Sequence, residues 1–137
     1  MLCDNCWLVQ TEDFVGSAEM FSEDYAYFSS YSSTWLEHAR NYVENMTTRF
    51  NLNSDSMVVE IAANDGYLLQ FFKENNIPCF GIEPTKGTAE KAIEKSIETI
   101  VDFFGNKFAM DLVKTKGKQD LIIGNNVLAH VPNINDF

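Results

Sequence analysis

The sequence predicts an α/β fold with a parallel sheet, and three observations support this. Short apolar runs alternate with amphipathic helical segments between residues 57 and 125. The first run, 57–62, leads into a turn of small residues before the next helix. Polar or small residues stand at the ends of all four predicted strands. Since strand–helix–strand units form parallel sheets with right-handed crossovers, these ends should meet at one edge.

The length of 137 residues fits one domain, but the composition divides the chain into two unequal parts. Residues 1–50 form a small Cys- and Tyr-rich segment that ends in a helix. Thr34 is predicted as the N-cap of that helix, because Glu37 three residues later would complete a capping box. The helix should bury a face made of Trp35, Ala39, Tyr42, Val43 and Met46. The polar stretch 51–56 opens the second part, residues 51–137.

The second part contains the alternating elements. Strands are expected at 57–62, 79–83, 97–101 and 120–125. Helices are expected at about 66–75, from about 84 onward and at about 104–114, where Gly117 ends the last helical region. The middle helix should bury a face made of Ala89, Ala92 and Ile93.

The turn after the first strand is the strongest functional signal. It contains the small or polar residues Ala62, Asn64, Asp65 and Gly66, and such turns receive nucleotide-like ligands at a helix N-terminus. Glu60 in the strand and Asp65 in the turn would repel a phosphate and suit a cationic or hydroxyl-rich ligand. S-adenosylmethionine fits, because it carries an ammonium group, a sulfonium and a ribose. All five residues are therefore predicted to bind this cofactor. The absence of Gly-x-Gly-x-x-Gly argues against a nicotinamide cofactor.

Glu83 ends the second strand, at roughly the 20-residue spacing of an acidic residue that binds ribose hydroxyls. Alternatively, Glu83 is a carboxylate that complements the dipole of the next helix. Asp102 and Phe103 follow the third strand and can meet an adenine amino group and ring. The alternative is a capping Asp and a core Phe.

Asn125 and Asn126 follow the fourth strand, and their carbonyls can face the sulfonium or the methionine end. Alternatively, they only form a turn. His130 is a candidate general acid or base, because histidine titrates near neutral pH. Its apolar setting also fits a structural histidine.

The charge balance limits the partners. The chain has 20 acidic residues against 10 basic ones, a net charge of −10, so nucleic acid is not an expected ligand. The acidity also fits a solubilising surface. No apolar run approaches the roughly 20 residues of a membrane span, and the N-terminus does not resemble a signal peptide. A cytoplasmic protein without membrane contact is expected.

Cys3 and Cys6 have the spacing of half a zinc site. A structural zinc ion usually takes four protein ligands, and the remaining cysteine, Cys79, falls in a predicted strand. Two chains that each donate one pair would complete the site, so a homo-oligomer is one expectation.

Five motifs together resemble the S-adenosylmethionine-dependent sugar C-methyltransferases of deoxysugar biosynthesis. They are Cys3-x-x-Cys6-Trp-Leu-Val-Gln10, Phe21-Ser-Glu-Asp-Tyr25-x-Tyr27-x-Ser-Ser30, Val59-Glu-Ile-Ala-Ala-Asn-Asp-Gly-Tyr-Leu-Leu69, Gly81-Ile-Glu-Pro84 and Gly124-Asn-Asn-Val-Leu-Ala-His-Val131. The resemblance implies a Rossmann-like class I methyltransferase fold that follows an N-terminal zinc-binding module. It also implies a cofactor site made of Asn64, Asp65, Gly66, Glu83, Asp102, Phe103 and Asn125 or Asn126.

The resemblance further implies that the region of Tyr25 and Tyr27 approaches a nucleotide sugar. The alternative is that these tyrosines pack between module and domain. Tyr25, Tyr27 and His130 are the candidate catalytic residues for C-methylation of a nucleotide-linked keto-deoxysugar. The family's first cysteine pair and its C-terminal domain have no counterpart, so the chain is expected to be truncated at both ends, with a partial sheet. The alternative function is a non-catalytic S-adenosylmethionine-binding or assembly module, in which the unfinished sheet edge pairs with a second copy.

Overall fold

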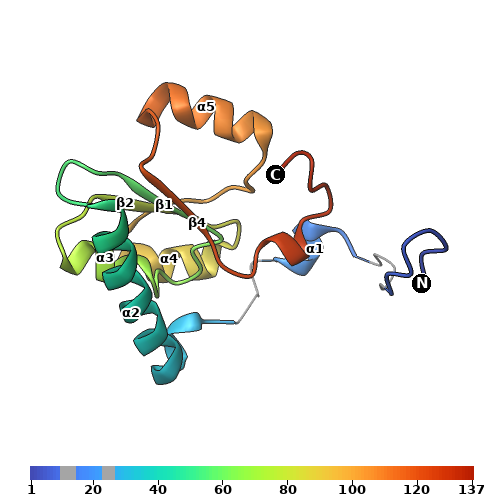
Figure 1. Ribbon diagram of the computed structural model, residues 1–137, viewed down its shortest axis with the longest axis horizontal. Coiled ribbons are helices and arrows are strands. Elements are labelled where there is room, and N and C mark those ends of the chain that lie inside the picture. Colours follow the sequence, from blue (N-terminus) through green and yellow to red (C-terminus); the bar gives the residue numbers. More distant parts are fainter. Residues whose placement is uncertain (10–14, 23–26) are drawn as a thin grey trace.

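The computed structural model describes residues 1–9, 15–22 and 27–137. Its centre is a four-stranded parallel sheet in the order β3-β2-β1-β4 (Figure 1). The strands are β1 (Val58–Ile61), β2 (Cys79–Ile82), β3 (Glu98–Ile100) and β4 (Leu121–Gly124). The strand β1 pairs with both β2 and β4, and Ile61 at its end is in register with Ile82 and Gly124. The predicted α/β fold is confirmed, and the strand ends meet at one edge.

Helices cover both faces of this sheet. In Figure 1, α5 (Asn106–Lys116) lies above it, and α2 (Ser33–Phe50), α3 (Leu69–Glu74) and α4 (Lys86–Glu94) lie below it. Three short elements complete the described fold: α1 (Ser17–Met20) and the 3-10 turns η1 (Ser29–Tyr31) and η2 (Leu128–His130). None of the helices in the described ranges is long and apolar enough to cross a membrane.

The two faces of β1 enter different cores because side chains alternate along a strand. Val58 packs with Val43 of α2 and Phe72 of α3 on the lower face. Val59 and Ile61 pack with Leu112 of α5 and the neighbouring strand residues on the upper face. Glu60 shares the parity of Val58, so this carboxyl is carried to the side of α2 and α3.

Two sequence predictions about the helices are wrong in detail. The N-cap of α2 is Ser32, whose Oγ accepts from the Trp35 N–H at 3.2 Å, so Thr34 lies inside the first turn. On α4, Ala89 and Ala92 are fully buried, but Ile93 is 50% exposed. One residue turns a helix by about 100°, which carries Ile93 from Ala92 to the margin of the buried face.

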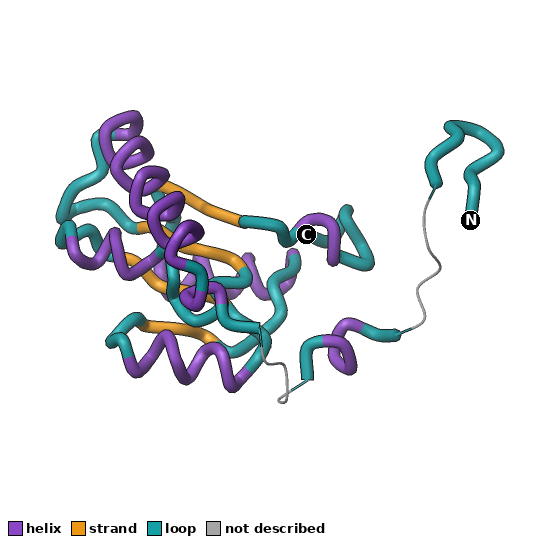
Figure 2. The backbone as a smooth tube through the Cα atoms, turned by 90° about the horizontal axis from the view of Figure 1, so that it is seen from below, coloured by secondary structure: helices purple, strands orange, loops and turns teal. Residues whose placement is uncertain are grey.

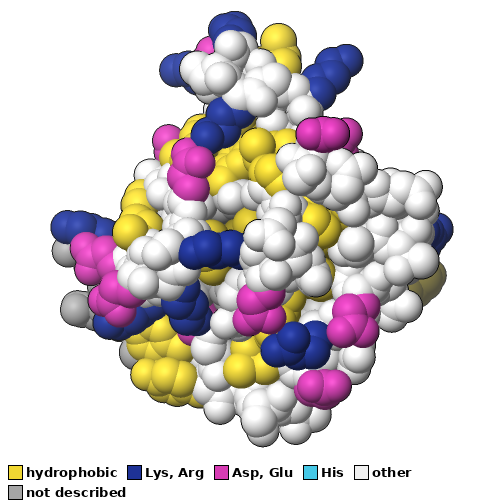
Figure 3. Space-filling model, turned by 90° about the vertical axis from the view of Figure 1, so that its left-hand side faces the viewer, with side chains coloured by type: hydrophobic (Ala, Val, Ile, Leu, Met, Phe, Trp, Pro, Cys, Tyr) yellow, Lys and Arg dark blue, Asp and Glu magenta, His cyan; other side chains and the backbone are white. Residues whose placement is uncertain are grey.

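The predicted face of α2 is confirmed at four of its five positions: Ala39 and Val43 are buried in the core, and Trp35 and Tyr42 pack against it. Met46 is half-buried. Residues 1–9 lie apart from the sheet in both ribbon views (Figures 1 and 2). A single bridge joins Leu2 and Val9 there. The side of the molecule shown in Figure 3 carries acidic and basic side chains interspersed with apolar ones, so the net charge forms no single-sign surface on that side.

Candidate functional site

A cavity of about 640 Å³ opens at the carboxyl ends of the strands. Nine residues singled out from the sequence line it: Tyr27, Ala62, Asn64, Glu83, Asp102, Phe103, Asn125, Asn126 and His130. In a doubly wound sheet this is the edge where ligands bind. The sheet order explains how they come together, because Asp102 follows β3, Glu83 follows β2, Ala62 follows β1 and Asn125 follows β4. The four strand ends therefore present their side chains in one row.

Glu83 is the buried carboxylate of this row, with only 4% of its surface exposed. Its Oε2 accepts from the Asn64 N–H at 2.8 Å, and its Oε1 accepts from the Thr85 N–H at 2.9 Å. A carboxylate has about four lone-pair sites, so these two bonds leave capacity for further donors. The backbone fixes Glu83 in place and leaves it able to accept from the hydroxyls of a ligand.

Asp102 and Phe103 are more open. Asp102 Oδ1 accepts from the Phe103 N–H at 2.8 Å, and the Phe103 side chain is 42% exposed. The alternative of a core phenylalanine is therefore wrong at this position. A carboxylate beside an accessible ring at the end of the row suits a flat ligand group that carries an amino group.

Asn125 belongs to a buried polar cluster below the cavity. Its Nδ2 donates to Tyr67 Oη at 3.0 Å and lies 3.4 Å from Glu60 Oε1. Both contacts use the amide nitrogen, so the amide oxygen takes no part in them. Glu60 is fully buried and does not line the cavity. Burial raises the pKa of Glu60 well above its usual range, although hydrogen bonds from Tyr67 and Asn125 oppose that rise.

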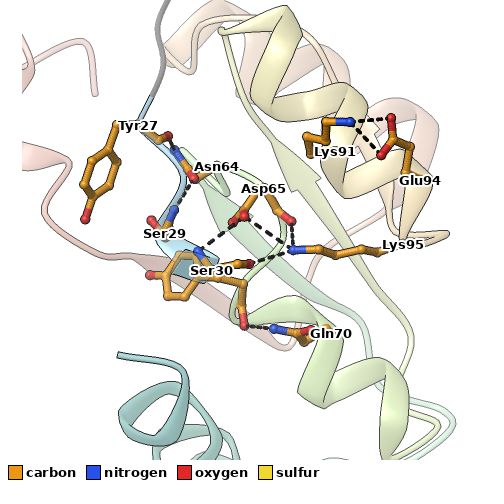
Figure 4. A network of polar contacts seen from close by, with 10 residues as sticks. Tyr27, Ser29, Ser30, Asn64, Asp65, Gln70, Lys91, Glu94 and Lys95 are labelled. Atoms are coloured by element: carbon orange, nitrogen blue, oxygen red, sulfur yellow. Dashed lines mark hydrogen bonds and ion pairs between the residues drawn. The ribbon is translucent and has the colours of Figure 1, made fainter. Parts of the chain in front are cut away.

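Asp65 and Gly66 do not line the cavity either. Both have a structural role in the turn after β1. Asp65 is 3% exposed and faces Lys95, with 3.4 Å between Oδ2 and Nζ (Figure 4). Gly66 has φ +72°, and a Cβ there would stand 2.6 Å from Ile97 Cδ1 and 3.2 Å from Ala92 Cβ. The glycine therefore permits close packing of the turn on α4 and on Ile97, the residue before β3. The carboxylates that favoured a cationic ligand in the sequence, Glu60 and Asp65, are not the ones in the cavity; Glu83 and Asp102 are.

The candidate catalytic residues differ in their placement. His130 lines the cavity from η2, and its ring meets Phe21 edge-on, with 6.2 Å between ring centroids. Tyr27 also lines the cavity and is 59% exposed. Tyr25 lies outside the described residues. Sequence analysis thus placed two candidate proton-transfer groups at the cavity.

Sequence analysis missed an aromatic part of the lining. Trp35 and Tyr67 stack with 5.9 Å between ring centroids, and Phe104 meets Phe137 edge-on at 5.4 Å. All four line the cavity. Burial, followed by the charge of Glu60, raises the pKa of the Tyr67 phenol, so this hydroxyl stays protonated. No periodic pattern singles out Tyr67, but it directly follows Gly66 in the turn after β1, a region where ligand contacts cluster.

The cysteine pair adopts a tight turn. The Trp7 N–H donates to the Cys3 carbonyl at 2.9 Å, and the Cys3 N–H donates to the Leu8 carbonyl at 2.9 Å. Hydrogen bonds from the backbone of Cys6 and Asn5 lower the pKa of the Cys3 thiol, which favours the thiolate that a metal requires. Within the described ranges, however, no group of three or more potential metal ligands is found. Cys3 and Cys6 supply two of the roughly four ligands that a structural zinc site takes, so this part of the chain does not fit zinc on its own.

The parallel sheet, its order and the cavity at its carboxyl edge define a Rossmann-like class I methyltransferase fold. This fold is shared with magnesium protoporphyrin IX methyltransferase (ChlM) from Synechocystis PCC 6803, solved with bound SAM. That similarity has a TM-score of 0.55 at 17% identity and covers 71% of this chain and 47% of that one.

Among curated proteins, the chain is similar to C-methyltransferase NovU from Streptomyces niveus, with 26% identity over 136 residues. The similarity covers 99% of this chain but 32% of the relative, so the chain spans about a third of the relative's length. It confirms the resemblance to S-adenosylmethionine-dependent C-methyltransferases that the sequence motifs indicate. No protein-family model matches the chain.

Proposed function

We propose that the chain binds S-adenosylmethionine in the 640 Å³ cavity and provides the cofactor-binding part of a C-methyltransferase. The observation that carries the proposal is the row of Asp102, Glu83 and Asn125 along the strand ends, in the order β3-β2-β1-β4. Adenine, ribose and the methionine end follow one another in the same way along the extended cofactor.

The individual contacts follow from the chemistry of each side chain. Asp102 accepts from the adenine amino group while Phe103 packs on the ring. Glu83 uses its remaining lone pairs for the two ribose hydroxyls. The amide nitrogen of Asn125 bonds Tyr67 and Glu60. Its amide oxygen is not used in these bonds and faces the cationic end of the cofactor. This set fits a hydroxyl-rich cation better than a pyrophosphate, because the row contains carboxylates and no basic side chain among its described members.

We further propose that the acceptor is a nucleotide-linked keto-deoxysugar, as the similarity to a C-methyltransferase suggests. A base removes a proton from the carbon beside the keto group, and that carbon then forms a bond to the methyl group. The cofactor supplies this methyl group from its sulfonium, whose sulfur keeps the electron pair of the broken bond. His130 and Tyr27 line the cavity and are the candidate proton acceptors that we propose for this step. Tyr25 is a further candidate on the same segment.

Calorimetric titration with S-adenosylmethionine and with S-adenosylhomocysteine tests the binding. The variant Asp102→Ala should weaken both ligands by about 1.5–3 kcal/mol, the range for one lost hydrogen bond to a charged acceptor. Its stability should not change much, because Asp102 is exposed. Glu94→Gln, an exposed change on α4 away from the cavity, is the matched control.

The absence of heat with either ligand would contradict the proposed site. If binding occurs, incubation with labelled cofactor and nucleotide keto-sugars distinguishes an enzyme from a binding module. Binding without methyl transfer to any such sugar would support the non-catalytic alternative.

A further inference from the structure

We propose that Asn64 is a positioning residue that holds residues 27–31 against the strand ends, so that this segment forms one wall of the ligand cavity. We call residues 27–31 the strap. The inference rests on the proposed function, because it assigns the strap to the same S-adenosylmethionine site. It also changes the role of Asn64, from a direct ligand contact to a residue that builds the cavity.

The side chain of Asn64 is committed to the strap through both of its polar groups. Its Nδ2 donates to the Tyr27 carbonyl at 2.9 Å, and its Oδ1 accepts from the Ser29 N–H at 2.9 Å. The amide therefore bonds the carbonyl of Tyr27 and the N–H of Ser29, two residues further along. A neighbouring β-strand would bond the same two backbone groups. Asn64 is 8% exposed and Ser29 is 7% exposed, so water competes little for these bonds. Figure 4 shows the Asn64 side chain directed at this backbone.

A second fastening lies one residue further along both segments. The Ser30 N–H donates to Asp65 Oδ2 at 3.3 Å, and Lys95 Nζ donates to Ser30 Oγ at 2.7 Å and to the Asp65 carbonyl at 2.7 Å. Lys95 follows the last turn of α4, and its ammonium group contacts both Ser30 of the strap and Asp65 (Figure 4). The strap is thus fastened to the turn after β1 and to Lys95, the C-cap residue of α4.

The fastened segment contributes to the cavity itself. Tyr27 and Ser29 line it, and Ser32, immediately after the strap, caps α2 and so fixes Trp35, which lines it as well. The backbone of Asn64 also donates to Glu83 Oε2 at 2.8 Å. One residue therefore connects the carboxylate proposed for the ribose to the segment that closes the cavity. A ligand that engages Glu83 should tighten the strap, and a loose strap should weaken the ligand.

The variant Asn64→Gly tests this directly. Asn64 has φ 51°, a left-handed conformation that glycine adopts without strain, so the change removes the side chain and spares the backbone. Asn76→Gly is the matched control, because Asn76 also has a positive φ (57°), is exposed and does not line the cavity. A second variant, Ser29→Pro, removes the N–H that donates to Asn64 Oδ1 together with the Ser29 hydroxyl, and Ser29→Ala shows the effect of losing the hydroxyl alone. Proline is tolerated at the first position of η1, and Phe28 already has the extended backbone (φ −115°, ψ 116°) that precedes proline.

Two measurements are made on the whole chain: amide hydrogen exchange at Ser29 and Ser30 by NMR, and the dissociation constant for S-adenosylhomocysteine. One neutral hydrogen bond shifts an equilibrium by about fivefold. Asn64→Gly removes two such bonds and should therefore speed exchange at Ser29 and weaken the ligand by up to about 25-fold, while amides of β1 keep their rates. Ser29→Pro removes one of them and should weaken the ligand by about fivefold, with little further effect when combined with Asn64→Gly. In the wild-type chain, the ligand should slow exchange at Ser29. The control Asn76→Gly should match the wild type in both measurements.

The outcomes separate the two proposals. Unchanged exchange at Ser29 in Asn64→Gly would overturn the holding role whatever the ligand does. Faster exchange with an unchanged dissociation constant would overturn the strap as a wall of the site while leaving the proposed function standing. If the wild-type chain binds no ligand, the proposed function fails, and the coupling of strap and ligand fails with it.

Discussion

The buried carboxyl of Glu60 should make the stability of this protein fall as pH rises, and Glu60→Gln should abolish that fall. Glu60 is fully buried, and its Oε2 has no hydrogen-bond partner among the described residues. Burial raises the pKa of Glu60 well above the ordinary value of a glutamate, with further rises from the charges of Glu83 and Asp65. The folded chain therefore holds this proton at pH values where the unfolded chain has lost it.

The sign and size of the effect follow from this difference. Above about pH 4.5 and below the raised pKa, the folded state binds one more proton than the unfolded state. The free energy of unfolding then falls by about 1.4 kcal/mol for each pH unit across that window. Below pH 4.5 both states are protonated, and the contribution is fully present. Glutamine keeps the shape of the protonated acid and cannot ionise, so the stabilisation of Glu60→Gln relative to wild type should grow with pH through the same window.

Urea unfolding from pH 4.5 to pH 7.5 measures this difference. The comparison of variant with wild type cancels the titration of the other groups. Glu44→Gln on the exposed side of α2 is the control, because it removes one surface charge. Curves for wild type and Glu60→Gln that run parallel over the whole pH range would refute the reasoning.

Two further predictions concern the turn after β1 and use the same measurement. Gly66→Ala should cost about 1–3 kcal/mol, because Gly66 has a positive φ (72°) and a Cβ there would stand 2.6 Å from Ile97 Cδ1. Gly16→Ala is the control, because no atom lies within 4 Å of a Cβ there; equal losses would show that the contact with Ile97 relaxes freely. Lys95→Met should cost about 3 kcal/mol, because Asp65 would remain buried without its cation. Lys114→Met, which breaks an ion pair with both partners at least 60% exposed, should cost under about 1 kcal/mol, and similar losses for the two variants would contradict a special role for Lys95.

Sequence reasoning succeeded where the topology alone decides position. Parallel strands bring their carboxyl ends to one edge, so Glu83, Asp102 and Asn125 could be placed together without knowing any contact. The sequence did not predict how deeply each of these side chains is buried. Glu83 is fixed by the N–H groups of Asn64 and Thr85, which depends on the exact path of the turn.

Sequence reasoning failed where side-chain direction decides. Alternation along β1 carries Glu60 to the face of α2 and α3, below the cavity and not into it. The partners of Asn64 and Asp65 lie 35 or more residues earlier in a segment without periodicity, the strap. No local pattern connects residues so far apart, and the same holds for Lys95, which lies 30 residues after Asp65.

The central claim is that the row of strand ends binds S-adenosylmethionine, and NMR titration tests it most directly. On addition of S-adenosylhomocysteine to the labelled chain, the amide signals of Asn64, Glu83, Phe103 and Asn125 should shift together and saturate with one dissociation constant. Signals on the outer face of α5, such as Met110, should stay in place, since this residue does not line the cavity. Shifts confined to residues outside the cavity, or no shifts at millimolar ligand, would contradict the account.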